Sequence, residues 1–233
     1  MLWGLVFVVP LLLPDYPPAM LSLGRYLAFG VIALMLAYSD RRRLLALQAA
    51  DWWRATELAL IGNLVYYLCL AGAIQLAGAP VPTMLIGTLP IVIAIASNFG
   101  AEALPWRRLA PSLLVIALGI VLVNRHETAH LADPHSQYAH RLGILLAIGA
   151  LLAWTWYPIR NAYWLRQRPA ISSGTWAVAQ GLATLPLAAL GMLAAGFHFD
   201  GDSAFDYPWG ARPLRYLGLM LLLGLCASWL GTL

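Results

Sequence analysis

Residues 149–163 read GALLAWTWYPIRNAY, an apolar run in which Trp154 comes early and Pro158 follows shortly after. The run lies inside a longer apolar segment, 142–164. A membrane helix needs about 20 mostly apolar residues, because the hydrocarbon of a bilayer is about 30 Å thick and each helical residue rises about 1.5 Å. The segment therefore predicts a helix that crosses a membrane.

The composition of the whole chain agrees with this prediction. Of its 233 residues, 61% are hydrophobic and 10% are charged, whereas a soluble domain carries about a quarter charged and about half apolar residues. The chain has too little polar surface to cover a water-soluble globule. We therefore expect an all-α polytopic membrane protein.

Eight apolar segments are candidates for membrane spans. They lie near 1–13, 18–38, 55–77, 80–103, 109–124, 142–164, 171–196 and 214–233. Short connections join them, and many of these connections carry Pro, Gly or Asp. The first segment is too short to cross a bilayer, since twelve helical residues reach only about 18 Å. We expect the start of this first helix to be missing from the chain.

The positions of the arginines predict the orientation in the membrane. All 14 basic residues are arginines. The even-numbered connections, between spans two and three, four and five, and six and seven, carry Arg41, Arg42, Arg43, Arg54, Arg107, Arg108, Arg166 and Arg168. The alternate connections carry fewer arginines, mixed with acidic residues. By the positive-inside rule, the N-terminus is cytoplasmic and the 125–141 loop is external. This distribution explains the net charge of +4 without a nucleic-acid partner.

An internal similarity predicts two related halves. LWGLVFVVP at 2–10 resembles AWTWYPIRN at 153–161, and IGNLVYYL at 61–68 resembles LGLCASWL at 223–230. If the sixth span repeats the first, each unit has five helices, and an odd number of crossings inverts the second unit relative to the first. Inverted repeats are common in secondary transporters, where the substrate site lies between the repeats near the midplane.

The repeat gives a domain division. The first unit covers 1–124, an external loop covers 125–141, and the second unit covers 142–233. The second unit has three spans, so we expect two further helices that this chain lacks.

Five segments together resemble the EamA-type transporters of the drug/metabolite transporter superfamily, and most of all the bacterial aromatic amino acid exporters. These are LWGLVFVVP at 2–10, YYLCLAGAIQLAGA at 66–79, TLPIVIAIASNFGAEAL at 88–104, LLVIALGIVLV at 113–123 and GALLAWTWYPIRNAY at 149–163. The resemblance covers essentially the whole chain and rests on the order of the segments. It implies ten helices in two inverted five-helix repeats around a central cavity. It also implies a bacterial inner-membrane transporter of small molecules, with neither enzymatic activity nor a cofactor.

One motif points to a different function. His126, Glu127 and His130 have the H-E-x-x-H spacing that holds zinc on a helix in metalloproteases. Here the motif begins where the fifth span ends, and Asp133 and Pro134 follow at once. We expect those two residues to break a helix. A solvated external loop is the favoured interpretation, with adventitious metal binding and a catalytic zinc site as alternatives.

Arg25 is the clearest ionisable residue within a span. It lies about 10 Å from the outer end of the second span and has two interpretations. It is either a counter-charge for a substrate carboxylate or an arginine whose side chain extends outward to the lipid headgroups.

The remaining candidates for the cavity wall are aromatic, polar or helix-bending residues within the spans. They are Trp154, Tyr157, Tyr66, Tyr67, Trp3, Trp176, Gln180, Asn98, Gly87 and Pro90. Rings with a few amide and hydroxyl groups suit a flat apolar molecule with a polar end. Ordinary packing is the alternative for each ring, and interhelical hydrogen bonding for Gln180 and Asn98. We expect Gly87 and Pro90 to kink the fourth span beside the site.

These residues predict an exporter of aromatic or other neutral amino acids that works by alternating access. No carboxylate lies in a helix core, and because a proton antiporter commonly uses one, we expect facilitated diffusion. The alternative is a broad multidrug or cationic-metabolite exporter of the same architecture.

Small residues at spacings of three or four, such as Gly143, Ala147 and Ala150, predict close helix packing.

Overall fold

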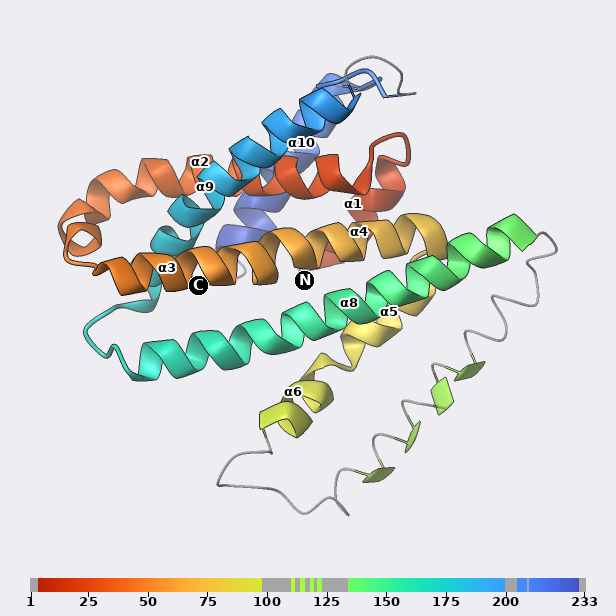
Figure 1. The fold of residues 1–233 in the computed structure, drawn as a ribbon, viewed down its shortest axis with the longest axis horizontal. Helices are drawn as coiled ribbons and strands as arrows, with labels where there is room; N and C mark the ends of the chain where they lie inside the picture. Colours follow the sequence, from red (N-terminus) through yellow and green to blue (C-terminus); the bar gives the residue numbers. More distant parts are fainter. Residues whose placement is uncertain are drawn as a thin grey trace.

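The computed structural model describes residues 4–97, 110–111, 114–115, 118–119, 121–122, 134–199, 205–208 and 210–230, and within these ranges the chain is helical with no strand (Figure 1). The elements are α1 (Leu5–Leu12), α2 (Pro18–Leu45), α3 (Ala49–Leu58), the π-helical segment η2 (Ala59–Val65), α4 (Tyr66–Ala77), α5 (Pro80–Gly87), α6 (Leu89–Ser97), α8 (Pro134–Arg166), α9 (Ser173–Phe199), α10 (Pro213–Leu222) and the π-helical segment η3 (Leu223–Leu230).

Four helical stretches are long and apolar enough to cross a membrane. They are Pro18–Leu45, Ala49–Ala77, Ser136–Arg166 and Ser173–Phe197. They coincide with the predicted spans 18–38, 55–77, 142–164 and 171–196, which confirms the all-α polytopic class. The predicted span at 80–103 begins with a shorter apolar helix, Pro80–Ile93. Most of the predicted span at 109–124 lies outside the described residues.

Two helices extend beyond their predicted ends. α2 continues through the arginines to Leu45, and Arg42 and Arg43 occupy its last turn, where basic side chains interact favourably with the helix dipole. α8 begins at Pro134, within the predicted 125–141 loop, so this helix starts earlier than expected. The residues before Pro134 lie outside the described ranges, so the expectation that Asp133 and Pro134 break a preceding helix stays a prediction. Proline is tolerated at the first position of a helix because the N–H that it lacks has no intrahelical partner there.

The predicted kink in the fourth span is a break between two helices. α5 ends at Gly87 and α6 begins at Leu89. The hydroxyl of Thr88, between them, donates a hydrogen bond to the Leu85 carbonyl at 2.6 Å. Pro90 lies in the first turn of α6, where a proline removes no helical hydrogen bond.

Small residues bring α8 against α4, and the two helices run side by side in Figure 1. A Cβ added at Gly143 would lie 2.6 Å from the Cβ of Ala77 and 2.9 Å from its backbone nitrogen. Ala147 and Ala150 on the same face are fully buried. The predicted packing role of these three residues is therefore confirmed.

A second close contact joins α2 to α9. A Cβ added at Gly30 would lie 2.9 Å from the Cα of Leu185, and one added at Gly181 would lie 2.4 Å from the Cβ of Ala33. Because both contacts depend on glycine, the two backbones can approach more closely than larger side chains would permit.

Two of the three basic connections lie within the described residues, and both are at one end of the bundle. The α2–α3 turn and the α8–α9 loop both lie at the left of Figure 1, and Arg168 pairs with Asp51 across them at 3.4 Å. At the opposite end, Arg212 pairs with Asp15 at 3.2 Å.

Within Figure 1, α2 runs from right to left and α9 from left to right. Opposite directions are what an inverted repeat requires; the repeat and the cytoplasmic N-terminus stay predictions.

Candidate functional site

A cavity of about 100 Å³ lies among α2, η2, α8, α9 and η3. Its wall is formed by Arg25, Tyr26, Phe29, Asn63, Trp154, Tyr157, Asn161, Leu165, Ser173, Trp176, Ala177, Gln180, Ala227 and Ser228. The wall combines aromatic rings, neutral polar groups and one charged side chain. It is built by helices from both predicted repeats.

Stacked rings form one side of this cavity. Trp154 of α8 stacks on Tyr66 of α4, with ring centroids 4.5 Å apart, and on Tyr157, with centroids 5.1 Å apart. Tyr66 is fully buried behind Trp154 and does not reach the cavity wall itself. The stack fixes the orientation of the rings that do reach it, so a flat molecule would meet a preformed aromatic surface.

A cluster of neutral polar groups forms the neighbouring side. The carboxamide oxygen of Asn161 accepts hydrogen bonds from Trp176 Nε1 at 2.7 Å and from Gln180 Nε2 at 3.2 Å. The carboxamide oxygen of Gln180 accepts one from the Tyr157 hydroxyl at 2.9 Å. α8 and α9 therefore share one hydrogen-bonded network, which holds the polar groups in fixed positions at the cavity wall.

Asn63 joins η2 to α9 beside this cluster. Its Nδ2 donates a hydrogen bond to the Thr184 hydroxyl at 3.3 Å, and that hydroxyl in turn donates to the Gln180 carbonyl at 2.6 Å. Asn63 lies in the π-helical segment η2, and Ser228 of the cavity wall lies in the other π-helical segment, η3. π-Helical turns often occur at functional sites, where they displace a side chain from the regular helix face.

Arg25 extends inward, not to the headgroups. Its side chain is only 3% exposed, and its Nε donates a hydrogen bond to the Ser228 hydroxyl at 3.1 Å. The guanidinium carbon lies 4.4 Å from the ring centroid of Tyr67 and 4.9 Å from that of Tyr26. Of the two interpretations that the sequence allowed, this position excludes the outward one.

The predicted site residues divide into three groups. The cavity wall contains Arg25, Trp154, Tyr157, Trp176 and Gln180, and the second layer behind it contains Tyr66 and Tyr67. Two residues lie elsewhere: Gly87 and Pro90 are exposed at the α5–α6 break and do not line the cavity. The break bends the chain as expected but lies away from this site. Trp3 and Asn98 lie outside the described residues.

Several residues of the wall were not predicted from the sequence. The polar ones are Asn63, Asn161, Ser173 and Ser228. Each is a single polar residue within or at the end of an apolar helix. This isolated polarity is the sequence feature by which the four residues could have been predicted. Asn161 lies near the end of the predicted span 142–164, where a polar side chain does not stand out from the adjoining connection.

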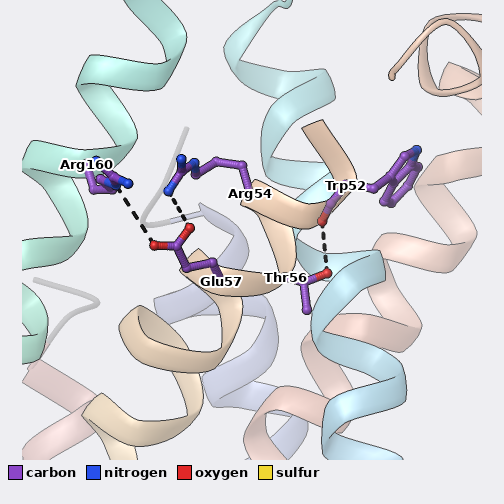
Figure 2. A network of polar contacts seen from close by, with 5 residues as sticks. All are labelled: Trp52, Arg54, Thr56, Glu57 and Arg160. Carbon is purple, nitrogen blue, oxygen red and sulfur yellow. Dashed lines mark hydrogen bonds and ion pairs between the residues drawn. The ribbon is translucent and has the colours of Figure 1, made fainter. Parts of the chain in front are cut away.

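A charged network lies towards the basic end of the bundle (Figure 2). Glu57 of α3 pairs with Arg54 on its own helix and with Arg160 of α8, whose Nε lies 3.9 Å from the Glu57 Oε1. Figure 2 also shows the Thr56 hydroxyl donating to the Trp52 carbonyl at 2.9 Å.

Beyond this network, a second cavity of about 410 Å³ lies between the α2–α3 turn and the α8–α9 loop. Ser172 lines this second cavity and Ser173 lines the first, so the two are neighbours.

Membrane-spanning helices around a ring-lined polar cavity define the chain as a membrane transporter. Residues 1–125 match the EamA-like transporter family, and the chain belongs to this family. It is 43% identical to the inner membrane protein YtfF of Escherichia coli strain K12 over 238 residues, which cover 100% of this chain and 74% of YtfF. A protein of known crystal structure has the same fold, with a TM-score of 0.54 at 19% identity over 96% of this chain and 75% of that one.

Family membership confirms the resemblance to EamA-type transporters that the sequence showed. It supports a transporter in place of the zinc protease that His126, Glu127 and His130 suggested, and those three residues lie outside the described ranges.

Proposed function

We propose that this transporter exports aromatic or other neutral amino acids across the bacterial inner membrane, by alternating access through the cavity described above. One observation carries the proposal. The Trp154–Tyr157 ring surface and the Asn161–Gln180 amide cluster adjoin in a single wall. A flat apolar side chain fits against the rings, while neutral hydrogen-bonding groups accommodate the polar end of the same molecule.

The size of the cavity supports a conformational cycle. Sites for small molecules commonly have volumes of about 300–1,000 Å³, whereas this cavity has about 100 Å³. A substrate therefore requires the helices around it to separate. The wall combines α2 and η2 of the first predicted repeat with α8, α9 and η3 of the second, so relative movement of the two predicted repeats would widen it.

The chemistry of the wall supports facilitated diffusion. Among the residues that line the cavity in the described part of the chain, none is acidic. Glu57 and Asp51 lie on α3 at the basic end of the bundle. A carboxylate at the substrate site is a common proton carrier in antiporters, and the described wall offers none.

Counterflow in proteoliposomes tests the proposal. Purified protein is reconstituted into vesicles loaded with unlabelled phenylalanine, threonine, methionine or a quaternary ammonium ion, and uptake of the labelled compound is followed. We expect phenylalanine to give the fastest counterflow and an imposed pH gradient to leave its rate unchanged. Faster counterflow of the quaternary ammonium ion would instead support the multidrug alternative.

A matched pair of tryptophan substitutions locates the site. Trp154→Ala removes the central ring of the stack and is expected to reduce phenylalanine counterflow by roughly tenfold, because aromatic pairs contribute about 0.5–1.5 kcal/mol beyond the area that they bury. Trp53→Ala removes an indole that is 74% exposed on α3 and is expected to leave counterflow unchanged. Equal effects of the two substitutions would place the transport path elsewhere.

A further inference from the structure

Arg25 is the charged residue in the wall of the cavity, within the part of the chain that the structure describes. A guanidinium remains charged at any physiological pH and carries five N–H donors. Burying such a group is costly unless an anion or several hydrogen-bond acceptors compensate for the lost water. The contacts of Arg25 therefore show what compensation the fold provides.

That compensation is incomplete. The Nε donates to Ser228, whereas Nη1 is buried and has no hydrogen-bond partner. None of the ion pairs among the described residues includes Arg25. The guanidinium thus keeps a buried N–H donor group that has no acceptor, and no carboxylate in the described part of the chain pairs with it.

Two tyrosine rings hold the guanidinium without neutralising it. Its carbon lies 4.4 Å from the ring centroid of Tyr67 and 4.9 Å from that of Tyr26. Both distances are within the range of cation–π attraction, which acts on the planar group and uses none of its N–H donors. Ser228, from η3, fixes the Nε edge. The group is therefore oriented by α2, α4 and η3 together, with hydrogen-bonding capacity to spare.

We propose that Arg25 binds the carboxylate of the transported molecule, with Ser228 as a positioning residue for the guanidinium. This inference rests on the proposed function and assigns the residue that recognises the carboxylate of its substrates. A charged donor that lacks an acceptor recognises a carboxylate strongly. The same charge repels an amine or quaternary ammonium ion that has no carboxylate, so selection operates in both directions.

Competition during phenylalanine counterflow tests this assignment. The competitors are phenylalaninamide, which keeps the ring and the amine but lacks the carboxylate, and 3-phenylpropionate, which keeps the ring and the carboxylate but lacks the amine. For the unmodified protein, we expect phenylalaninamide to compete at least roughly tenfold more weakly than phenylalanine, the factor for one hydrogen bond to a charged group. If phenylalaninamide competes as strongly as phenylalanine, the proposed role of Arg25 is overturned, whereas the proposed export of amino acids remains intact.

Variants assign that discrimination to one side chain. Arg25→Gln is expected to weaken the apparent affinity for phenylalanine by about the same tenfold factor. Competition by phenylalaninamide is expected to remain unchanged or to become stronger. Ser228→Ala, which keeps the guanidinium, is expected to weaken competition by phenylalanine by a smaller factor and to leave competition by phenylalaninamide unchanged. It provides the test if Arg25→Gln fails to fold. Arg212→Gln, at an exposed arginine paired with Asp15, is the matched control and is expected to change nothing.

Two further outcomes separate this inference from the proposed function. If Arg25→Gln or Ser228→Ala weakens phenylalanine and phenylalaninamide equally in folded protein, Arg25 has a structural role only and the inference is overturned. If the unmodified protein transports 3-phenylpropionate in an Arg25-dependent manner but takes up no amino acid, the carboxylate site stands and the export of amino acids does not.

Discussion

Gly62 of η2 lies directly against the ring of Tyr157 on α8: a Cβ added at Gly62 would lie 2.2 Å from Tyr157 Cδ2 and 2.9 Å from Tyr157 Cβ. The only space available there is occupied by the tyrosine. Tyr157 in turn stacks on Trp154 and donates its hydroxyl hydrogen to Gln180. A glycine of the first predicted repeat therefore determines where a cavity ring of the second can lie.

Gly62→Ala is predicted to impair transport by displacing that ring. The added methyl group would force Tyr157 to move, because Cβ atoms do not approach within 3.0 Å of other atoms. Loss of the hydrogen bond to Gln180 corresponds to about 1 kcal/mol, or roughly a fivefold weaker apparent affinity for phenylalanine in counterflow. The matched control is Gly218→Ala in α10, which would meet nothing within 4 Å. An unchanged affinity for Gly62→Ala would show that Tyr157 is not part of the site.

Gly143→Ala is predicted to destabilise the protein without a direct effect on the cavity. The new methyl group would meet the backbone nitrogen of Ala77 at 2.9 Å, and a backbone atom cannot rotate away. Overpacking of this kind commonly costs about 1–3 kcal/mol, which would appear as a lower thermal midpoint in detergent.

Two further variants test the cause of that destabilisation. Ala77→Gly combined with Gly143→Ala removes the contact with the Ala77 Cβ and is expected to recover part of the loss. Gly87→Ala, where a Cβ would meet nothing within 4 Å, is expected to leave the midpoint unchanged. If Gly87→Ala and Gly143→Ala lowered the midpoint equally, the close approach of α8 to α4 would not be the reason.

The sequence was sufficient for four long spans and for the rings of Trp154, Tyr157 and Trp176, but of the polar network it predicted Gln180 and not Asn161. Long apolar runs specify spans because the bilayer requires about 20 such residues, and small residues such as Gly143 reveal helix contacts by their spacing. Asn161 was not predicted because nothing in a one-dimensional pattern shows that a residue at the end of α8 meets Trp176 of α9. The inward position of Arg25 could not be predicted for the same reason. Its hydrogen-bond partner, Ser228 of η3, is 203 residues away in the sequence.

The expectation for Pro90 failed for a related reason. A proline and a glycine in an apolar span do interrupt the helix, as the α5–α6 break shows. The direction in which the interrupted chain faces depends on tertiary packing, however, and here both residues are exposed. Local sequence thus predicted the bend but not its distance from the cavity.

The predicted orientation can be tested by labelling single cysteines from one side of the membrane. In a background with Cys69→Ala and Cys226→Ala, Arg42→Cys and Arg212→Cys introduce thiols at exposed positions at opposite ends of the bundle. We expect a membrane-impermeant maleimide added to intact spheroplasts to label Arg212→Cys only, because the arginine-rich connections remain in the cytoplasm. Labelling of Arg42→Cys alone would reverse the assigned orientation.

The Glu57–Arg160 pair gives a prediction about the opening of the cavity at the basic end. This pair joins α3 to α8, which belong to different predicted repeats (Figure 2). Partly exposed ion pairs contribute about 0.2–1 kcal/mol, so Glu57→Gln is expected to shift the equilibrium between closed and open forms by up to about fivefold. The measurement is the rate at which a thiol reagent modifies Ala227→Cys, at a buried position of the cavity wall, in the same background without native cysteines.

Asp40→Asn is the matched control for that shift. Asp40 pairs with Arg43 at 3.6 Å on the same helix, α2, and its carboxylate side chain is 21% exposed, against 28% for that of Glu57. Its removal therefore eliminates an ion pair without releasing one helix from another. We expect the modification rate of Ala227→Cys to rise with Glu57→Gln and to remain unchanged with Asp40→Asn. Equal rates in the two variants would mean that α3 and α8 are held together by the packing around them, and that the Glu57 carboxylate has no part in controlling access to the cavity.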